Sequence, residues 1–154
     1  MRRQSKVLIW ALPAIMAGTL GAVSCNDSTA PSPVTVNVTL REFNITLDRA
    51  SAPRGPVIFH VTNAGEDTHE FLVIRTDRAP DALPTEANGS YQENGPGTQL
   101  LQEIEEVPPG ASRDLTIDLT EGSHVLICNM VMTEADGTVE VHYALGMHTA
   151  FRVE

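Results

Sequence analysis

Apolar and polar residues alternate along several short segments after residue 33. The alternation is clearest in VTVNVTL at 34–40 and in VIFHVTN at 57–63. Successive side chains of a β-strand point to opposite faces, so a period of two predicts strands with one buried face. The segment 43–47 alternates in the same way, and further strands are predicted at 69–76, 103–107, 114–119, 124–130 and 148–154.

Turn-forming residues separate these segments. The Pro- and Gly-containing stretch at 51–56 predicts a turn, as do the PPG at 108–110 and the pair Glu121-Gly122. No amphipathic helical pattern of any length is visible. Many short strands joined by Gly and Pro turns predict an all-β fold, an antiparallel β-sandwich. We expect a single domain over residues 34–154, without internal repeats.

Two segments depart from this regular pattern. Residues 77–101 carry little apolar periodicity and several Asn-Gly and Pro-Gly pairs. They predict a long excursion with at most a short helical turn, which is unusual in a small domain. Residues 129–141 contain Asp136-Gly137, a strong signal for a tight turn between two strands. This second segment therefore predicts a hairpin that folds back on itself.

The N-terminus has the layout of an export signal. Three basic residues, Arg2, Arg3 and Lys6, precede an apolar stretch that runs from Val7 to about Leu20. Small residues follow, as they do before a signal-peptide cleavage site. We therefore predict a signal peptide over residues 1–24 and an exported, periplasmic or otherwise extracytoplasmic protein.

The predicted cleavage site also resembles a lipobox. Small residues at 22–24 precede Cys25, which would be lipidated and become the first residue of the mature chain. The polar, Pro-containing segment 25–33 then predicts a flexible tether between a membrane anchor and the domain. The alternative is a plain secretory signal followed by an incidental cysteine.

The charge of the chain is strongly acidic. It has 20 acidic and 10 basic residues, and every acidic residue lies after Cys25. A surface of this sign repels phosphate backbones, which excludes nucleic-acid binding as a function. It favours basic protein partners, although solubility alone would also explain it.

Four residues form a candidate metal site. His69 opens a predicted strand after a turn, Cys128 ends the apolar run HVLIC, and His142 and Met147 lie in HYALGM before the last strand. Two imidazoles, a thiolate and a thioether suit copper, which needs ligands that both of its oxidation states accept. Zinc accepts the first three but gains little from a methionine. A disulfide with Cys25 is the other use for Cys128.

The stretches VIFHVTNAGEDTHEF, HVLICN and HYALGMHTAFRVE resemble the cupredoxin family over about residues 34–154. This resemblance implies a Greek-key β-sandwich and one type 1 copper ion held by His69, Cys128, His142 and Met147. It also implies that a backbone N–H just after Asn63 donates to the cysteine sulfur. The chain departs from the family where the 129–141 insert separates the cysteine from the second histidine.

The remaining histidines and methionines are weaker candidates. Alternation places His60 on the solvent side of its strand, and His124 is expected at the surface. His148 lies beside Met147 and is a competing ligand. Met130 and Met132, in the insert, are alternative axial ligands or simple packing residues.

The resemblance implies a carrier of single electrons on the outer face of a membrane, with no catalytic turnover of its own. Its partners would be redox proteins such as a cytochrome or an oxidase with a basic docking face. Two other hypotheses stay open. One is a protein that stores or delivers Cu(I), and the other is a metal-free interaction module with the same fold.

Overall fold

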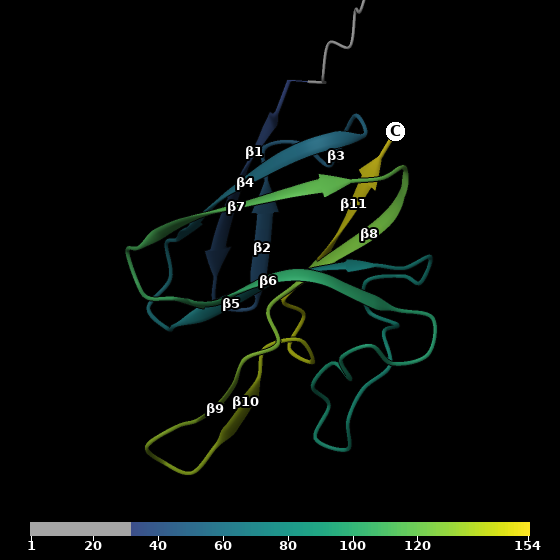
Figure 1. Cartoon of the computed structure of the whole chain (residues 1–154). Helices are drawn as coiled ribbons and strands as arrows, with labels where there is room; N and C mark the ends of the chain where they lie inside the picture. Colours follow the sequence, from purple (N-terminus) through teal and green to yellow (C-terminus); the bar gives the residue numbers. More distant parts are fainter. Residues whose placement is uncertain (1–31) are drawn as a thin grey trace, which may run out of the picture.

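The computed structural model describes residues 32–154, which form two β-sheets packed face to face (Figure 1). The predicted signal peptide, Cys25 and most of the predicted tether lie outside these residues. The first sheet has the order β2-β1-β4-β7, and the second has the order β3-β11-β8-β5-β6. Among the described residues there is no helix, and hence none long and apolar enough to span a membrane.

The strands of the first sheet are β1 (Val34–Arg41), β2 (Asn44–Leu47), β4 (Gly55–Asn63) and β7 (Ser112–Leu119). Those of the second are β3 (Ser51–Ala52), β5 (His69–Arg75), β6 (Gln99–Val107), β8 (Gly122–Ile127) and β11 (His148–Val153). A separate pair is formed by β9 (Val131–Thr133) and β10 (Val139–Val141).

The predicted sandwich is confirmed, but two of its strand pairs are parallel. β1 runs parallel to β4, and β3 runs parallel to β11. The segment 51–56, predicted as a simple turn, is the cause. Between β2 and β4 the chain crosses to the second sheet, forms β3 there, and returns to the first sheet. β4 therefore comes back alongside β1 in the same direction.

The core lies between the sheets and follows the period-two pattern. Every second residue of β4 is buried, among them Phe59, whose ring centroid lies 5.4 Å from that of Phe71 and 5.3 Å from that of Phe151. Phe71 and Phe151 belong to the second sheet, so the three rings join the two layers. Cys128 and Met147 are buried in the same cluster. The candidate ligands are thus part of the core.

The excursion at 77–101 is packed against the second sheet rather than free of it. It forms turns without a helix, and β6 already begins at Gln99. Leu83 and Tyr91 are buried against the outer faces of β5 and β8, together with Tyr143. The Leu83 N–H donates to the Tyr143 hydroxyl, which in turn donates to the carbonyl of Pro80. β5 is therefore covered on both faces, which explains its continuous apolar run.

The 129–141 insert forms the predicted hairpin. β9 and β10 pair antiparallel, and the turn is closed by the Glu134 N–H donating to the Thr138 carbonyl at 2.8 Å. Gly137 takes a positive φ of 86° there, a conformation that favours glycine. At the base, the His142 N–H donates to the Met130 carbonyl at 3.0 Å. The hairpin projects from the end of the sandwich (Figure 1), and its two ends meet.

Replacing Phe59 by Ala should lower the free energy of unfolding by about 3–5 kcal/mol, because it leaves a cavity among three packed rings. Urea unfolding of the two proteins measures the difference. The control is Val139→Ala on the hairpin, where 57% of the side chain is exposed and we expect a change within about 0.5 kcal/mol. Equal effects of the two substitutions would contradict this account of the core.

Candidate metal centre

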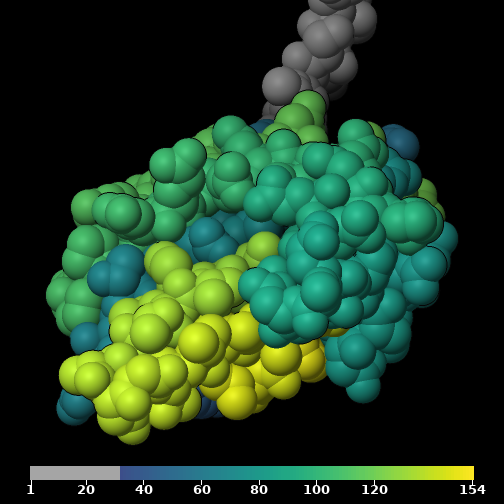
Figure 2. Space-filling model, turned by 90° about the horizontal axis from the view of Figure 1, so that it is seen from below, coloured from purple at the N-terminus to yellow at the C-terminus, as the bar shows by residue number. Residues whose placement is uncertain are grey.

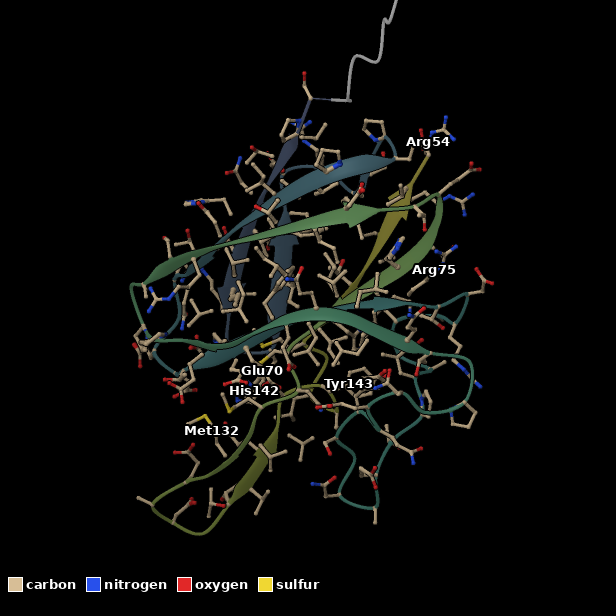
Figure 3. The ribbon with its side chains drawn as sticks, viewed as in Figure 1. Arg54, Glu70, Arg75, Met132, His142 and Tyr143 are labelled. Atoms are coloured by element: carbon tan, nitrogen blue, oxygen red, sulfur yellow. The ribbon has the colours of Figure 1, made fainter. Side chains whose placement is uncertain are left out.

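Three buried side chains with metal-binding atoms converge at one end of the sandwich. His69 is the first residue of β5, Cys128 directly follows β8, and His142 directly follows β10. The two Nδ1 atoms lie 3.3 Å apart, and the cysteine sulfur lies 4.0 Å from that of His69 and 3.4 Å from that of His142. Figure 3 shows His142 at the end of the molecule that carries the hairpin. The hairpin thus returns the second histidine to the cysteine.

These separations suit a single metal ion. Bonds of about 2.0 Å to nitrogen and about 2.3 Å to sulfur, as at zinc, let one ion reach all three atoms. Within residues 32–154, the outer nitrogen Nε2 of His69 and of His142 has no hydrogen-bond partner. These outer nitrogens face away from the shared point, so the fit to a metal rests on the three converging donor atoms. The donor set fits copper, and its nitrogen and thiolate members also fit zinc.

Met147 lies against the same centre through its backbone. Its N–H donates to the His142 carbonyl, and its own carbonyl accepts from the Cys128 N–H, both at 3.0 Å. The side chain is fully buried in the core cluster that holds Cys128. The loop from His142 to Met147 is therefore fastened to the cysteine strand at its end. The role of Met147 as a fourth ligand stays a prediction.

The turn before His69 is held by a buried asparagine. The side-chain amide of Asn63 donates to the carbonyls of Asp67 and Val107, both at 2.7 Å, and its oxygen accepts from the Gly65 N–H at 2.8 Å. One side chain thus ties the turn to the end of β6. This arrangement sets where β5 begins and so where His69 points.

Known structures with the same architecture identify the fold. No protein-family model and no curated protein sequence matches the chain. Rusticyanin from Thiobacillus ferrooxidans is 17% identical, with a TM-score of 0.54 over 81% of this chain and 79% of that one. Auracyanin A from Chloroflexus aurantiacus, described as a "blue" copper protein, is 18% identical, with a TM-score of 0.52 over 80% of this chain and all of that one. The chain has the cupredoxin fold.

The electrostatics of this cupredoxin-fold site favour neutral ligands. Burial lowers the pKa of His69, an effect that neighbouring His142 strengthens, and burial also lowers the pKa of His142. Each neutral imidazole keeps a lone pair for a metal. Burial raises the pKa of the Cys128 thiol to about 12. Binding as a thiolate therefore requires a metal ion that displaces the proton.

The Cys128 sulfur accepts one backbone hydrogen bond, at 3.4 Å, from the N–H of Glu70. We expected this donor just after Asn63, and that expectation is wrong. The amides of residues 64–67 donate instead to Leu40, Asn63 and Glu42. The residue that follows His69 lies beside the sulfur. The donor thus belongs to β5, the strand that also supplies His69.

The other histidines lie apart from this cluster. His60 is half-exposed and pairs with Asp114 at 2.6 Å, as its solvent-facing position predicts. His148 is partly buried and packs on the ring of Tyr143. The expectation that His124 lies at the surface is wrong, because this residue is almost fully buried. It occupies the same face of β8 as Leu126, which points into the core.

Two residues of the turn between β1 and β2 border the site and were not predicted. The Phe43 ring meets that of His142 edge-on, with centroids 5.4 Å apart, and Phe43 has a positive φ of 56°. Glu42 has its carboxylate 3.7 Å from Nε2 of His69. The segment has no motif that indicates a site, because its role follows from the pairing of β1 with β4.

Because three histidines are buried, we expect the metal-free protein to lose stability as the pH falls below about 6.5. Burial lowers the pKa of His69, His124 and His142 from 6.5, so the unfolded chain takes up these protons first. Their contribution is complete above pH 6.5 and declines as the pH falls toward the folded-state pKa values. Glu70 opposes this trend, because burial raises its pKa from 4.5 to about 7. Its contribution is complete below pH 4.5 and is lost as the pH rises through about 7.

Urea unfolding of the metal-free Glu70→Gln variant between about pH 7.5 and 5 removes the opposing contribution of Glu70. Glu103, whose pKa burial also raises, opposes the histidines in both proteins. We expect a steady loss of stability on acidification, steeper than in the wild type. Adding His124→Leu should make the profile shallower by removing one of the three groups. A flat profile in Glu70→Gln would show that the imidazoles are not buried as neutral groups.

Proposed function

We propose that the protein is a type 1 copper protein that carries single electrons. The observation that carries this proposal is the convergence of three buried side chains, His69, Cys128 and His142, on one point of a cupredoxin fold. Auracyanin A, which shares the fold, is described as a "blue" copper protein. The donor types are those of a trigonal blue-copper site.

The chain's own residues would hold one copper ion through the two Nδ1 atoms, the Cys128 sulfur and the Met147 thioether. Bound copper supplies the one-electron couple between Cu(II) and Cu(I). The frame around it limits rearrangement, because β5, β8 and the ligand loop are fixed by the core and by backbone hydrogen bonds. The Glu70 N–H stabilises negative charge on the sulfur. We infer no catalytic turnover of its own.

A docking face for a redox partner lies at the same end of the molecule. Three large apolar side chains are exposed on the described part of the chain, Val131, Val139 and Leu145, and all belong to the hairpin or the ligand loop. Figure 2 shows these two segments, yellow-green and yellow, side by side. The acidic charge of the chain favours a basic partner, such as a cytochrome or an oxidase.

The proposed setting is outside the cytoplasm. The signal-like segment 1–24 supports export, and Cys25 in its lipobox-like context supports a lipid anchor. The segment 25–33 would then tether the domain to the membrane. The buried free thiol of Cys128 is consistent with this setting, because a metal ligand is a reason to keep a lone cysteine there.

The hairpin also supports a second candidate function. Met130 and Met132 flank the start of β9, and Met130 packs against the core cluster. Thioethers bind Cu(I) well, so these residues favour a protein that stores or delivers Cu(I). The remaining alternative is a metal-free interaction module, and only the fold supports it.

Copper reconstitution of the purified protein should give an intense visible thiolate-to-copper band and an EPR signal with narrow copper hyperfine splitting. Cys128→Ser should abolish the band, because it removes the thiolate. Met147→Leu should keep the band and raise the reduction potential, because the axial ligand tunes it. Absorption, EPR and redox titration check these results.

The same samples separate the three functions. Colourless Cu(I) binding that survives Cys128→Ser would favour delivery over electron transfer. An oxidised wild type that binds no copper would leave the interaction module. Either outcome would overturn the proposed electron carrier.

Val139→Arg should slow electron transfer to a basic cytochrome by about tenfold, the equivalent of 1.4 kcal/mol, while leaving the copper spectrum unchanged. The substitution removes apolar contact area and adds charge repulsion at an exposed position of the hairpin. Stopped-flow kinetics measures the rate. The control is Glu121→Gln, which changes net charge equally at the other end, beside Arg75 (Figure 3). Equal slowing by both variants would exclude a specific docking face.

A further inference from the structure

We propose that Glu42 is a positioning residue of the metal centre, whose carboxylate fixes the turn before His69 and holds a negative charge against the outer nitrogen of that ligand. This inference deepens the proposed function and rests on it for the copper measurements. It concerns a residue outside the four candidate ligands, in the turn that joins β1 to β2.

The carboxylate of Glu42 is bound to the backbone of another turn. Its Oε1 accepts from the N–H of Glu66 at 2.5 Å and from the N–H of Asp67 at 3.1 Å. Hydrogen bonds to a charged acceptor are about twice as strong as neutral ones. Two backbone N–H groups that donate to one carboxylate oxygen favour the charged form of Glu42. One side chain therefore connects the β1–β2 turn to the segment that delivers His69.

Gly65 leaves the space that this contact needs. A Cβ atom at position 65 would lie 2.9 Å from Cδ of Glu42 and closer still to Oε1. Any other residue there would therefore displace the carboxylate. The Gly65 N–H is itself bound by the Asn63 side chain at 2.8 Å. Asn63 thus holds the turn on one side and Glu42 holds it on the other, and Gly65 leaves room for both side chains.

The same carboxylate oxygen faces the imidazole of His69. Nε2 of His69 lies 3.7 Å from Oε1 and, within the described chain, has no hydrogen-bond partner. At this distance the interaction is electrostatic rather than a formed hydrogen bond. Nδ1 of the ring faces Cys128 and His142, so a metal there leaves the ring proton on Nε2, toward Glu42. A carboxylate behind a metal-bound histidine orients the ring and increases its basicity.

A fixed negative charge at this position should favour Cu(II) over Cu(I). Glu42→Gln keeps an oxygen acceptor for the two turn amides but removes the charge, so it should shift the redox equilibrium toward Cu(I). Because the side chain is about one-third exposed, solvent weakens the effect. We expect a shift on the order of tenfold, which is a rise of about 59 mV for a one-electron couple.

The matched control is Glu66→Gln, which removes the same charge from an exposed side chain of the turn before His69. Redox titration of the copper-loaded proteins gives the potentials, and EPR reports the ligand field. A clearly larger rise in Glu42→Gln than in Glu66→Gln supports the proposal. Equal shifts would overturn it, because they would mean that the site senses only net charge.

Gly65→Ala tests the geometry without changing any charge. It should raise the potential in the same direction as Glu42→Gln, because it pushes the carboxylate away from His69. Combining the two substitutions should add little beyond Glu42→Gln alone, since both act on one contact. Full additivity would show that Gly65 and Glu42 act independently and would contradict the proposed contact.

Amide hydrogen exchange of the metal-free protein tests, without copper, whether the Glu42 carboxylate holds the turn before His69. The N–H groups of Glu66 and Asp67 should be protected in the wild type and in Glu42→Gln, and should exchange faster in Glu42→Ala, which has no acceptor. Unchanged exchange in Glu42→Ala would show that the Glu42 carboxylate does not hold this turn. If the wild type bound no copper, the proposed function would fail, whereas this measurement would still decide whether Glu42 holds the turn.

Discussion

The packing of the two sheets against each other fixes the candidate metal centre, because the candidate ligands are themselves buried with the core. Cys128 and Met147 belong to the cluster that contains Phe59 and Phe71, and His69 begins the strand that carries Phe71. Burial therefore acts on structure and chemistry together. It places the donors and favours neutral imidazoles with free lone pairs, whereas it raises the pKa of the Cys128 thiol, so a metal ion must displace that proton to bind the sulfur.

The hairpin between Cys128 and His142 shows how such a site tolerates a long insertion. Its two strands pair with each other, and the bond from His142 to the Met130 carbonyl closes the base. The inserted residues thus begin and end close together. The number of residues between Cys128 and His142 therefore does not set the distance between these two side chains. The insertion adds surface next to the ligand loop without moving the ligands apart.

Local sequence patterns predicted most of the strands and the residues that converge at the site. Alternation located β1 and β4, the apolar run HVLIC located β8, and the Asp136-Gly137 pair located the hairpin, because each of these signals depends on neighbouring residues only. The parallel pairing of β1 with β4 depends on a crossing between sheets, which no local pattern reports. For the same reason Glu42 was missed, since its partners lie in a distant turn. His124 was misplaced because the expected strand starts at that residue, whereas β8 begins at Gly122 and places His124 on the same face as Leu126.

The side chain of Asn129, the residue after Cys128, bonds to the backbone of Tyr91 in the way that a neighbouring β-strand would. Its side-chain oxygen accepts from the Tyr91 N–H at 2.6 Å, and its amide donates to the Tyr91 carbonyl at 3.1 Å. Both bonds go to the backbone, so they do not depend on which side chain stands at position 91. The path of the long loop past the candidate metal centre is therefore held by these backbone contacts, in addition to the buried side chains of Leu83 and Tyr91. A segment that looks unconstrained along the chain is in this respect part of the wall of the site.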